Sequence, residues 1–410
     1  MNCRFCHTEL HQVFVDLDFA PISNAMLTQE QLSEPELYFP LKIFVCDSCR
    51  LVQVDEMQKA DRIFDADYTY FSSYSTSWLQ HAKRYVEMMV ERFGFSSGSQ
   101  VIEIASNDGY LLQYFRELGV PVLGVEPTAN TAQVAIDKGI PTMVEFFSTA
   151  FAERQLAGQG IKGDLILGNN VLAHVPDIND FVGGIKAALN DGGVVTMEFP
   201  HLLKLVAECQ FDTIYHEHFS YLSFFSVNRI FNAHGLELFD VEELPTHGGS
   251  LRIFAKHADD AGKPVAPAVQ QLLDAELQAG VDDAGYYADF QRRVDAIKYG
   301  ALEFLLQQKR AGKRVAAYGA ASKGNTFLNY CGIKGSDLIA FVVDASPHKQ
   351  NKYLPGSHIA VVSEEQIRQS KPDYVIILPW NLTEEISGQL DYIREWGGRF
   401  VVFIPELREF

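Results

Sequence analysis

The sequence predicts an α/β protein of two or three domains, and three observations support this fold class. Between residues 98 and 200, short apolar runs alternate with amphipathic stretches, which is the pattern of repeated βα units in a parallel sheet. The same alternation returns between residues 313 and 405. The length of 410 residues also exceeds what a single hydrophobic core usually organises.

The first fifty residues contain two Cys-x-x-Cys pairs, "CRFC" and "CDSC". Two such knuckles can supply four thiolates to one tetrahedral zinc ion. Two matched pairs in one short segment favour zinc over unrelated buried thiols or a redox pair. Since thiolates would fill every position around the metal, we expect a structural role. The predicted ligands are Cys3, Cys6, Cys46 and Cys49.

The segment 76–93, "TSWLQHAKRYVEMMVERF", has apolar residues at three- and four-residue steps, which predicts a helix. Just before it lies "YTYFSSYSTS", residues 68–77. Its hydroxyl side chains suit an N-capping stretch. Its aromatic residues equally suit a lid over a ligand, so both interpretations stay open.

The central region predicts five strands and the helices between them. In open parallel sheets, ligands bind at the carboxyl ends of the strands, near the change in strand order. A polar turn at 106–109 follows the first strand, and a helix is expected near 178–190. The later strands are "VPVLGVEP" (120–127), "IPTMVEFF" (140–147), "GDLILGNNVLAHV" (163–175) and "DGGVVTMEFP" (191–200).

The turn after the first strand, "EIASNDG", lacks the G-x-G-x-x-G pattern that brings backbone against a pyrophosphate. Its polar residues suit a ligand held through an amino-acid portion. Glu126 ends the second strand, where an acidic side chain can bind ribose hydroxyls. A nucleoside with an amino-acid tail and no phosphate describes S-adenosylmethionine. The predicted cofactor-binding residues are Glu103, Ala105, Asn107, Asp108, Gly109, Glu126 and Asn170.

The C-terminal region supports a second α/β unit. Residues 313–332 predict a strand, a Gly/Ser-rich turn and a helix. Three further strands follow: one ends at Asp344, and "PDYVIILPW" and "RFVVFIP" form the others. The turn "GAASKG" lacks the full nucleotide-loop pattern, but its amides at a helix N-terminus, with Lys323, could hold a phosphate. A merely structural turn is the alternative.

These motifs together resemble the sugar C-methyltransferase family, enzymes that methylate a ring carbon of nucleotide-linked deoxyketosugars. The resemblance implies a zinc-binding module at 1–75 and a class I, Rossmann-like methyltransferase domain at 76–257. It also implies a helical connector and a second Rossmann-like domain, which binds the nucleotide sugar, at 258–410. The matching segments, in order along nearly the whole chain, are "CRFC…CDSC", "EIASNDGYLL", "GVEP", "NNVLAHVPD", "YHEHFSYLS", "GGSLRIF" and "YGAASKGNTFLN".

The motif "YHEHFSYLS" at 215–223 combines the groups that such a reaction needs. The carbon next to a ketone becomes nucleophilic when a base removes its proton, and imidazole suits that task near neutral pH. Hydrogen-bond donors stabilise the enolate oxygen, and a carboxylate can orient an imidazole. The resemblance implies that His218 is the base. Tyr215 and Glu217 would assist it.

Two further sets of contacts follow from the resemblance. His174, after the fourth strand, is a second candidate to contact the keto oxygen. We leave out His216, since neighbours in an extended segment point to opposite sides. The residues expected to bind the substrate diphosphate are Ser322, Lys323 and Asn325, with His348, Lys349 and Lys352 as additional candidates.

Three functions compete at this stage: a C-methyltransferase, a small-molecule O- or N-methyltransferase, and a scaffold without catalytic activity. Polar residues aligned at strand ends argue against the scaffold. An O- or N-methyltransferase needs neither an enolate-forming base nor a second Rossmann-like domain. The resemblance suggests methylation at C3 of a dTDP-4-keto-6-deoxysugar, with C5 methylation of a related sugar as the alternative.

The formal net charge of −19 disfavours binding to nucleic acid or to anionic membranes. The sequence contains no apolar run long enough to span a bilayer, and its first residues do not form a signal-peptide pattern. We therefore expect a cytoplasmic protein with reduced thiols. Its expected partner is a nucleotide diphosphate sugar, and the expected state is a monomer.

Overall fold

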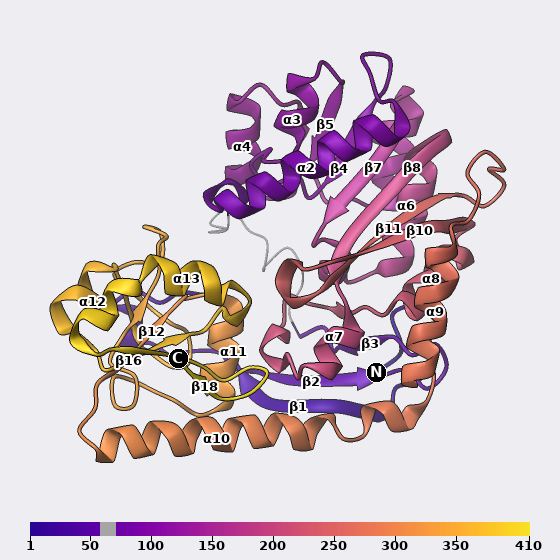
Figure 1. Ribbon diagram of the computed structural model, residues 1–410. Coiled ribbons are helices and arrows are strands. Elements are labelled where there is room, and N and C mark those ends of the chain that lie inside the picture. Colours follow the sequence, from indigo (N-terminus) through magenta and orange to yellow (C-terminus); the bar gives the residue numbers. More distant parts are fainter. Residues whose placement is uncertain (58–70) are drawn as a thin grey trace.

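The computed structural model describes residues 1–57 and 71–410, which form three sheets (Figure 1). A four-stranded sheet near the N-terminus has the order β1-β2-β3-β9. Two seven-stranded sheets follow along the chain. The predicted α/β fold class, with an N-terminal cysteine cluster and two Rossmann-like sheets, is confirmed.

The N-terminal sheet takes its fourth strand from the middle of the chain. It contains β1 (Gln12–Ala20), β2 (Phe39–Val45) and β3 (Val52–Val54). The last strand, β9 (Ser220–Tyr221), belongs to the "YHEHFSYLS" motif and pairs with β3 in antiparallel fashion. The predicted catalytic residues at 215–218 therefore lie just before an edge strand of the cysteine-containing module.

The four knuckle cysteines come together as predicted. Their sulfur atoms all lie within 4.8 Å of one another. The distance between the sulfurs is 3.5 Å for Cys3 and Cys49, and also 3.5 Å for Cys6 and Cys46. A tetrahedron with Zn–S bonds of about 2.3 Å separates its sulfurs by about 3.8 Å. The donor set and its spacing fit one structural zinc ion.

The central sheet has the order β10-β11-β8-β7-β4-β5-β6. Five strands, from β6 to β8, run parallel, and β11 lies antiparallel between β8 and β10. Their carboxyl ends therefore meet at one edge, as the sequence predicts. The strands are β4 (Val101–Ile104), β5 (Val122–Val125), β6 (Thr142–Met143), β7 (Gly163–Asn169), β8 (Leu189–Pro200), β10 (Leu236–Leu244) and β11 (Ser250–His257).

The helix predicted at 76–93 is α2 (Thr76–Phe93). The Ser75 hydroxyl accepts a hydrogen bond from the Trp78 amide, so the N-capping interpretation of the preceding stretch is confirmed at this residue. Residues 68–70 of that stretch lie outside the described residues. The other helices around this sheet are α3 (Leu112–Glu117), α4 (Ala129–Asp137), α5 (Thr149–Phe151), α6 (Ile178–Ala188), α7 (Leu202–Ala207) and α8 (Phe224–Ala233).

The C-terminal sheet has the order β14-β15-β13-β12-β16-β17-β18. Its five inner strands are parallel and its two edge strands antiparallel. The strands are β12 (Val315–Tyr318), β13 (Val342–Val343), β14 (Lys352–Tyr353), β15 (Ala360–Val362), β16 (Tyr374–Ile377), β17 (Arg399–Val402) and β18 (Arg408–Glu409). The helices of this part are α9 (Pro267–Ala279), α10 (Phe290–Arg310), α11 (Ser322–Tyr330), α12 (Glu365–Ser370) and α13 (Thr383–Gln389).

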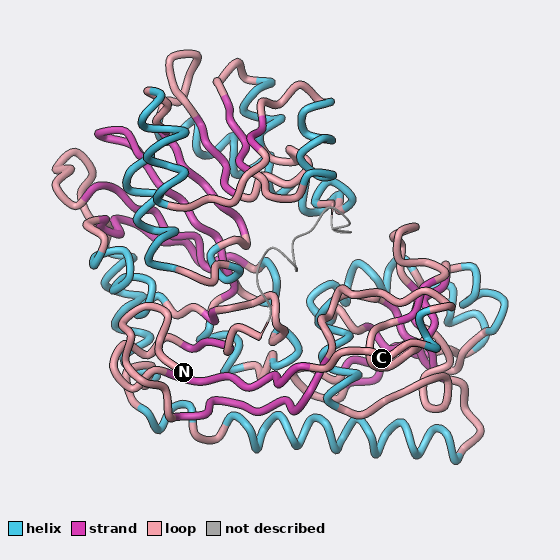
Figure 2. Tube along the Cα trace, turned by 180° about the vertical axis from the view of Figure 1, so that it is seen from behind, coloured by secondary structure: helices cyan, strands magenta, loops and turns pink. Residues whose placement is uncertain are grey.

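The N-terminal and C-terminal sheets share one hydrophobic core. The long helix α10 lies beside β1 and reaches the C-terminal sheet (Figures 1 and 2). On β1, Phe14 stacks on Phe290 of α10 with ring centroids 4.3 Å apart. The same buried cluster includes Phe211, Phe327 and Ile376. The two ends of the chain are therefore packed as one body beneath the central sheet.

Within the described ranges, no helix combines the length and apolar character that crossing a membrane requires.

We expect one zinc ion per chain. Replacing Cys46 with Ser removes a thiolate ligand, so it should release the metal and lower the free energy of unfolding by more than about 4 kcal/mol. Elemental analysis and thermal unfolding measure the two effects. Cys331→Ala is the control, because this buried cysteine lies outside the cluster and should leave the zinc content unchanged. Metal-free wild-type protein with normal stability would contradict the expectation.

Candidate active site

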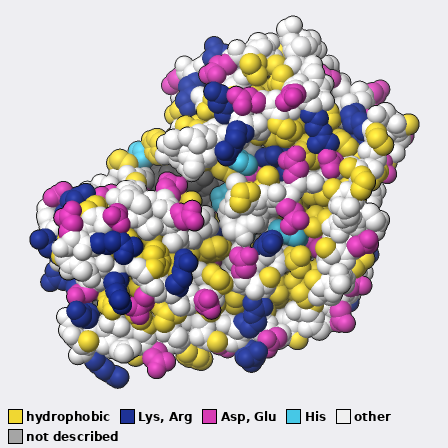
Figure 3. Space-filling view, in the orientation of Figure 1, with side chains coloured by type: hydrophobic (Ala, Val, Ile, Leu, Met, Phe, Trp, Pro, Cys, Tyr) yellow, Lys and Arg dark blue, Asp and Glu magenta, His cyan; other side chains and the backbone are white. Residues whose placement is uncertain are grey.

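One cavity of about 1210 Å³ lies where the carboxyl ends of the central strands, the 213–218 segment and the C-terminal domain meet. The space-filling view shows a hollow between the part of the molecule around the central sheet and the part around the C-terminal sheet, with histidine side chains beside it (Figure 3). Most of the predicted site residues line it, although they come from distant parts of the sequence. They are Ala105, Asn107, Glu126, Asn170, His174, Tyr215, Glu217, His218, Ser322 and Lys323.

The turn after β4 has an unusual backbone. Ala105 and Asn107 both have positive φ angles, of 55° and 49°. Residues with a side chain rarely adopt this conformation, and it recurs at ligand sites. Hydrogen bonds hold the turn, because the Asn107 amide donates to Glu126 Oε2 (2.8 Å) and its side-chain Oδ1 accepts from the Ser72 amide (2.9 Å).

Glu126 organises the turn as well as lining the cavity. Its Oε1 accepts hydrogen bonds from the Thr128 amide (2.8 Å) and the Thr128 hydroxyl. Burial raises the pKa of this carboxyl, although the hydrogen bonds from Thr128 oppose the effect. Because both oxygens already accept hydrogen bonds from protein groups, the carboxylate has a fixed orientation at the cavity wall.

Three predicted cofactor residues lie behind this wall. Glu103 is buried, and burial, followed by neighbouring carboxylates, raises its pKa well above the usual range. Asp108 Oδ2 accepts hydrogen bonds from the amide and hydroxyl of Ser73. Gly109 has a φ of 73°, and a Cβ there would lie 2.4 Å from Ile140. These residues are part of the structure that holds the turn, and they do not line the cavity.

Asn170 fixes a histidine that the sequence analysis missed. Its φ is 56°, and its side-chain amide donates to His247 Nε2 at 2.9 Å. His247 lines the cavity and itself has a positive φ of 55°. Burial, with a contribution from nearby Lys323, lowers the pKa of His247 to about 4. The sequence signal was weak, since His247 only precedes the quoted "GGSLRIF" segment.

Two histidines face each other in the cavity, with ring centroids 4.6 Å apart. His218 Nδ1–H donates to the Thr213 carbonyl at 2.8 Å, and His174 Nδ1–H donates to the Glu217 carbonyl at 2.7 Å. Burial lowers the pKa of His174 to about 4. Burial and then His174 lower the pKa of His218 well below its usual value. His218 is therefore neutral near pH 7, with an unprotonated Nε2.

The other residues of the motif are held in different ways. The ring centroids of Tyr215 and His218 lie 4.0 Å apart. Glu217 is 3% exposed, and its Oε1 accepts from Ser23 Oγ at 2.8 Å. Burial raises the pKa of Glu217. His216 donates through Nε2 to a backbone carbonyl of the N-terminal sheet at 3.2 Å and does not line the cavity.

The C-terminal wall of the cavity is tied to the catalytic segment. Lys323 Nζ donates to Asn381 Oδ1 at 3.1 Å and lies 4.7 Å above the Trp380 ring. Trp380 Nε1–H donates to Asp212 Oδ2 at 2.9 Å. Burial lowers the pKa of Lys323 and raises that of Asp212 to about 6. A cationic side chain is thus held on an aromatic surface beside the predicted base.

The remaining predicted substrate contacts lie in three places. Ser322 lines the cavity at the start of α11, whereas Asn325 is 1% exposed and does not line it. Lys349 also lines the cavity, and its Nζ donates to a backbone carbonyl of the 319–321 turn at 2.9 Å. The His348 ring stacks on Tyr74 across the two lobes. Lys352 lies in the edge strand β14, outside the lining.

An aromatic wall on α2 completes the cavity, and the sequence analysis did not single it out. Trp78 stacks on His81 with ring centroids 4.9 Å apart. His81 Nε2–H donates to Glu198 Oε2 at 2.8 Å, and Arg252 pairs with the same carboxylate at 2.8 Å. The three- and four-residue spacing of the helix contained this signal, but the same spacing also describes an ordinary core-facing stripe.

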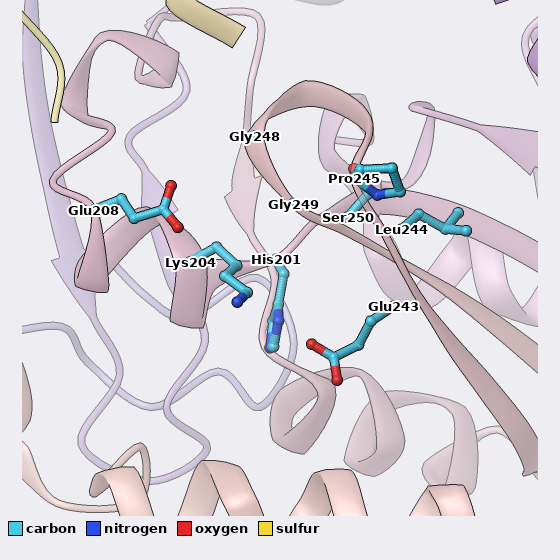
Figure 4. A pocket seen from close by; sticks show the side chains of 9 residues that line it. All are labelled: His201, Lys204, Glu208, Glu243, Leu244, Pro245, Gly248, Gly249 and Ser250. Carbon is cyan, nitrogen blue, oxygen red and sulfur yellow. The ribbon is translucent and has the colours of Figure 1, made fainter.

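A second hollow, of about 340 Å³, lies on the other side of the 244–249 loop (Figure 4). Lys204, Glu208 and Glu243 line it with charges of both signs. His201 also lines this hollow, and its Nε2–H donates to Oε1 of the buried Glu276 at 2.6 Å. The loop that carries His247 is therefore bounded by a hollow on each face.

Comparison with curated proteins gives a match along almost the whole chain. C-methyltransferase NovU of Streptomyces niveus is 37% identical over 407 residues, which cover 99% of this chain and 96% of NovU. The chain belongs to this C-methyltransferase family. Three family models match successive parts of this chain. They are described as "Putative zinc binding domain" (residues 3–64), "Methyltransferase domain" (residues 78–241) and "C-methyltransferase C-terminal domain" (residues 245–405).

Other similarities cover less than half of the chain. The ubiquinone biosynthesis O-methyltransferase of Chelativorans sp. is 31% identical over 98 residues, covering 24% of this chain and 39% of that protein. The solved magnesium protoporphyrin IX methyltransferase of Synechocystis, with bound S-adenosylmethionine, has a TM-score of 0.33 and 16% identity. That match covers 43% of this chain and 78% of the other.

The protein is thus a C-methyltransferase that depends on S-adenosylmethionine, and it has a structural zinc site. The cavity fits the cofactor, because buried side-chain atoms of Asn169 and Asn170 lack hydrogen-bond partners among the described residues. The strained turn after β4 and Glu126 lie on the same wall. We expect these groups to hold the amino-acid and ribose portions.

Replacing Glu126 with Ala should weaken S-adenosylmethionine binding by about 1–3 kcal/mol. The change removes the carboxylate that we expect to accept hydrogen bonds from the ribose hydroxyls, and it also removes the acceptor of the Asn107 amide. Calorimetry on purified protein measures the change. Glu117→Ala, at the exposed end of α3, is the control and should bind as wild type does. Equal affinities for both variants would count against this placement of the cofactor.

Proposed function

We propose that this C-methyltransferase removes the proton from the carbon next to the keto group of a nucleotide-linked deoxyketosugar and then methylates that carbon. The observation that carries the proposal is the state of His218. Its Nδ1 proton is held by the Thr213 carbonyl, so Nε2 is an unprotonated base in the cavity wall. Methylation at carbon requires such a base, because the carbon has no lone pair until its proton is removed.

In the proposed reaction, His218 Nε2 takes the carbon-bound proton, and the electrons of that bond move onto the keto oxygen as an enolate. Donors near the imidazole then stabilise the oxygen. Tyr215, whose ring lies 4.0 Å from the His218 ring, carries a hydroxyl for this purpose. His174, with ring centroids 4.6 Å from His218, is the second candidate. Glu217 is held by Ser23 and can accept from a substrate hydroxyl.

S-adenosylmethionine, when bound, supplies an electrophilic methyl group. The enolate carbon would then take that methyl, and the electron pair of the methyl–sulfur bond would go to the sulfur. The chain's own part is to place the nucleophile and exclude water. The wall of Trp78 and His81 and the strained turn after β4 give the cavity two fixed sides for this purpose.

The substrate diphosphate is proposed to bind at the C-terminal wall. Lys323 provides the positive charge there, and Ser322 and the first amides of α11 provide donors. Diphosphate at this position also offsets the Lys323 charge that disfavours a protonated His218. The cavity of about 1210 Å³ exceeds the common range of about 300–1,000 Å³ for one ligand, which suits a cofactor and a nucleotide sugar together.

The position of the new methyl group follows from the resemblance, which favours C3 of a dTDP-4-keto-6-deoxysugar. A ketone at C4 acidifies the hydrogens on both of its neighbours, so C5 of a related sugar is the alternative. Which neighbour faces His218 Nε2 decides between them, because the base can only reach one carbon in a given pose.

Replacing His218 with Ala should lower turnover by about 10²–10⁴-fold, since a positioned base contributes about that much. The direct measurement is exchange of substrate hydrogen with deuterated water in the presence of S-adenosylhomocysteine, which cannot donate a methyl. NMR identifies whether C3 or C5 exchanges. Tyr215→Phe and His174→Asn should cost less if they only stabilise charge on the oxygen.

His216→Ala is the control, because this neighbouring histidine points toward the N-terminal sheet and should retain exchange. Exchange at the wild-type rate in His218→Ala would move the role of base to another residue. Exchange by neither wild-type protein nor control, with a panel of nucleotide ketosugars, would reject the substrate class.

The pH dependence of exchange should show a base that stays unprotonated below pH 6.5. A histidine with a lowered pKa loses its proton-accepting form only as pH falls through that lower value, so the exchange rate should stay level through pH 6.5 and decline only at lower pH. A series of exchange rates between pH 4 and 9 measures this. An acid limb centred above pH 6.5 would disagree with the buried, neutral imidazole.

A further inference from the structure

Arg4, inside the first cysteine knuckle, reaches out of the zinc module into the catalytic loops. Its Nη1 donates to the Pro176 carbonyl at 2.6 Å, and its Nη2 donates to the Val54 carbonyl at 2.7 Å. The guanidinium carbon lies 5.4 Å from the centre of the Phe219 ring. The half-buried side chain therefore joins β3 to the loop after β7 and to the residue that follows His218.

The two loops that Arg4 contacts carry the two facing histidines. Pro176 lies two residues after His174, and Phe219 directly follows His218. The backbone joins these loops, because the Phe219 amide donates to the Ala173 carbonyl at 2.8 Å. The Phe219 carbonyl in turn accepts from the Val54 amide at 3.2 Å. A shift of Arg4 would thus act on both histidine loops together.

The other end of the arginine is fixed by the cysteine cluster. Arg4 directly follows Cys3, whose sulfur accepts a hydrogen bond from Gln53 Nε2 at 3.2 Å. The same glutamine accepts the Arg4 amide through Oε1 at 2.9 Å. Asn179 also donates to the Arg4 carbonyl at 3.1 Å. A metal ion bound to Cys3 would therefore fix the position of the Arg4 backbone, and with it the position of the side chain.

We propose that Arg4 is a positioning residue for the methyl transfer, which carries the geometry of the zinc-bound first knuckle to the loops of His174 and His218. This proposal rests on the proposed roles of those histidines. In this view the zinc module has a second task besides stability, because it sets the direction of the base. Arg4 is not among the residues that line the cavity, so it acts without touching the reacting atoms.

The chemistry of arginine suits this position better than that of lysine. The planar guanidinium donates to two carbonyls of different loops at fixed angles, whereas an ammonium is a single point charge on a flexible stem. The planar group can also lie over an aromatic ring, as Arg4 does over Phe219. Arg4→Lys should therefore keep the charge but hold only part of the geometry.

The second knuckle provides a matched control. Arg50 directly follows Cys49, as Arg4 follows Cys3, and Arg50 Nε donates to the Asp282 carbonyl at 2.8 Å. That carbonyl lies beyond α9, away from both histidine loops. Substituting Arg50 removes a guanidinium contact of the zinc module without touching the path to the histidines.

The test compares Arg4→Met, Arg4→Lys and Arg50→Met with wild-type zinc-loaded protein. A misplacement of a catalytic group by about 1 Å, caused by a mutation far from the reacting atoms, can cost about 100-fold in rate. We expect Arg4→Met to lose that much in turnover at saturating substrate, Arg4→Lys to lose less, and Arg50→Met to match wild type. Zinc content and affinity for S-adenosylmethionine should stay unchanged in all three.

A second readout needs no substrate. Nitrogen-15 NMR of histidine-labelled protein distinguishes the Nδ1–H tautomer that His174 and His218 adopt through their carbonyl partners. Arg4→Met should replace these two signals with mixed or broadened ones, whereas Arg50→Met should preserve them. Preserved tautomer signals and turnover in zinc-loaded Arg4→Met would overturn the proposal.

The two readouts separate this proposal from the proposed function. Wild-type protein inactive on every ketosugar would reject the substrate class, while the tautomer signals would still show whether Arg4 orders the histidines. Where Arg4→Met does not fold, Arg4→Lys decides: wild-type turnover with wild-type signals overturns the proposal. Equal losses in Arg4→Met and Arg50→Met would also overturn it, since both would then reflect general stability.

Discussion

The pairing of β9 with β3 is the constraint on which the rest of the site depends. Two residues of a mid-chain segment, Ser220 and Tyr221, add to the N-terminal sheet, and this fixes the loop that precedes them. His218 then has its Nδ1–H on the Thr213 carbonyl, and the Glu217 carbonyl orients His174 in the same way. Among the described residues, backbone carbonyls rather than carboxylates accept both Nδ1 protons, and these contacts set both tautomers.

Charged side chains of both signs line the cavity. Carboxyl groups gather around the turn after β4, where Glu126 faces the cavity and Glu103 lies beneath it. At the opposite wall, Lys323 lies on the Trp380 ring. In the proposed reaction, the carboxyl group of Glu126 suits a cationic cofactor, and the ammonium group of Lys323 suits an anionic substrate. Burial raises the pKa of Glu126 and lowers that of Lys323, so burial disfavours the charged form of each side chain.

The sequence predicted those features that follow from local pattern. The strands β4, β5 and β7, the α2 boundaries and the four-cysteine cluster are in the structure as predicted, because periodicity and metal-ligand spacing are local properties. His247 and Arg4 could not be found this way, since their roles depend on contacts with distant residues. The division into 1–75, 76–257 and 258–410, and the roles assigned to the site residues, stay predictions.

The shared core beneath the central sheet has a consequence for how the chain is made. Phe14 packs against Phe290, so nearly the whole methyltransferase region is synthesised between the two halves of one hydrophobic body. The N-terminal sheet emerges first, yet β9 and α10 complete it only after more than half of the chain has been translated. Contacts of such long sequence separation form slowly. The central domain can therefore fold on its own before β1 has its packing partners. Until β9 and α10 are synthesised, the apolar face of β1 stays exposed to solvent and is prone to aggregation.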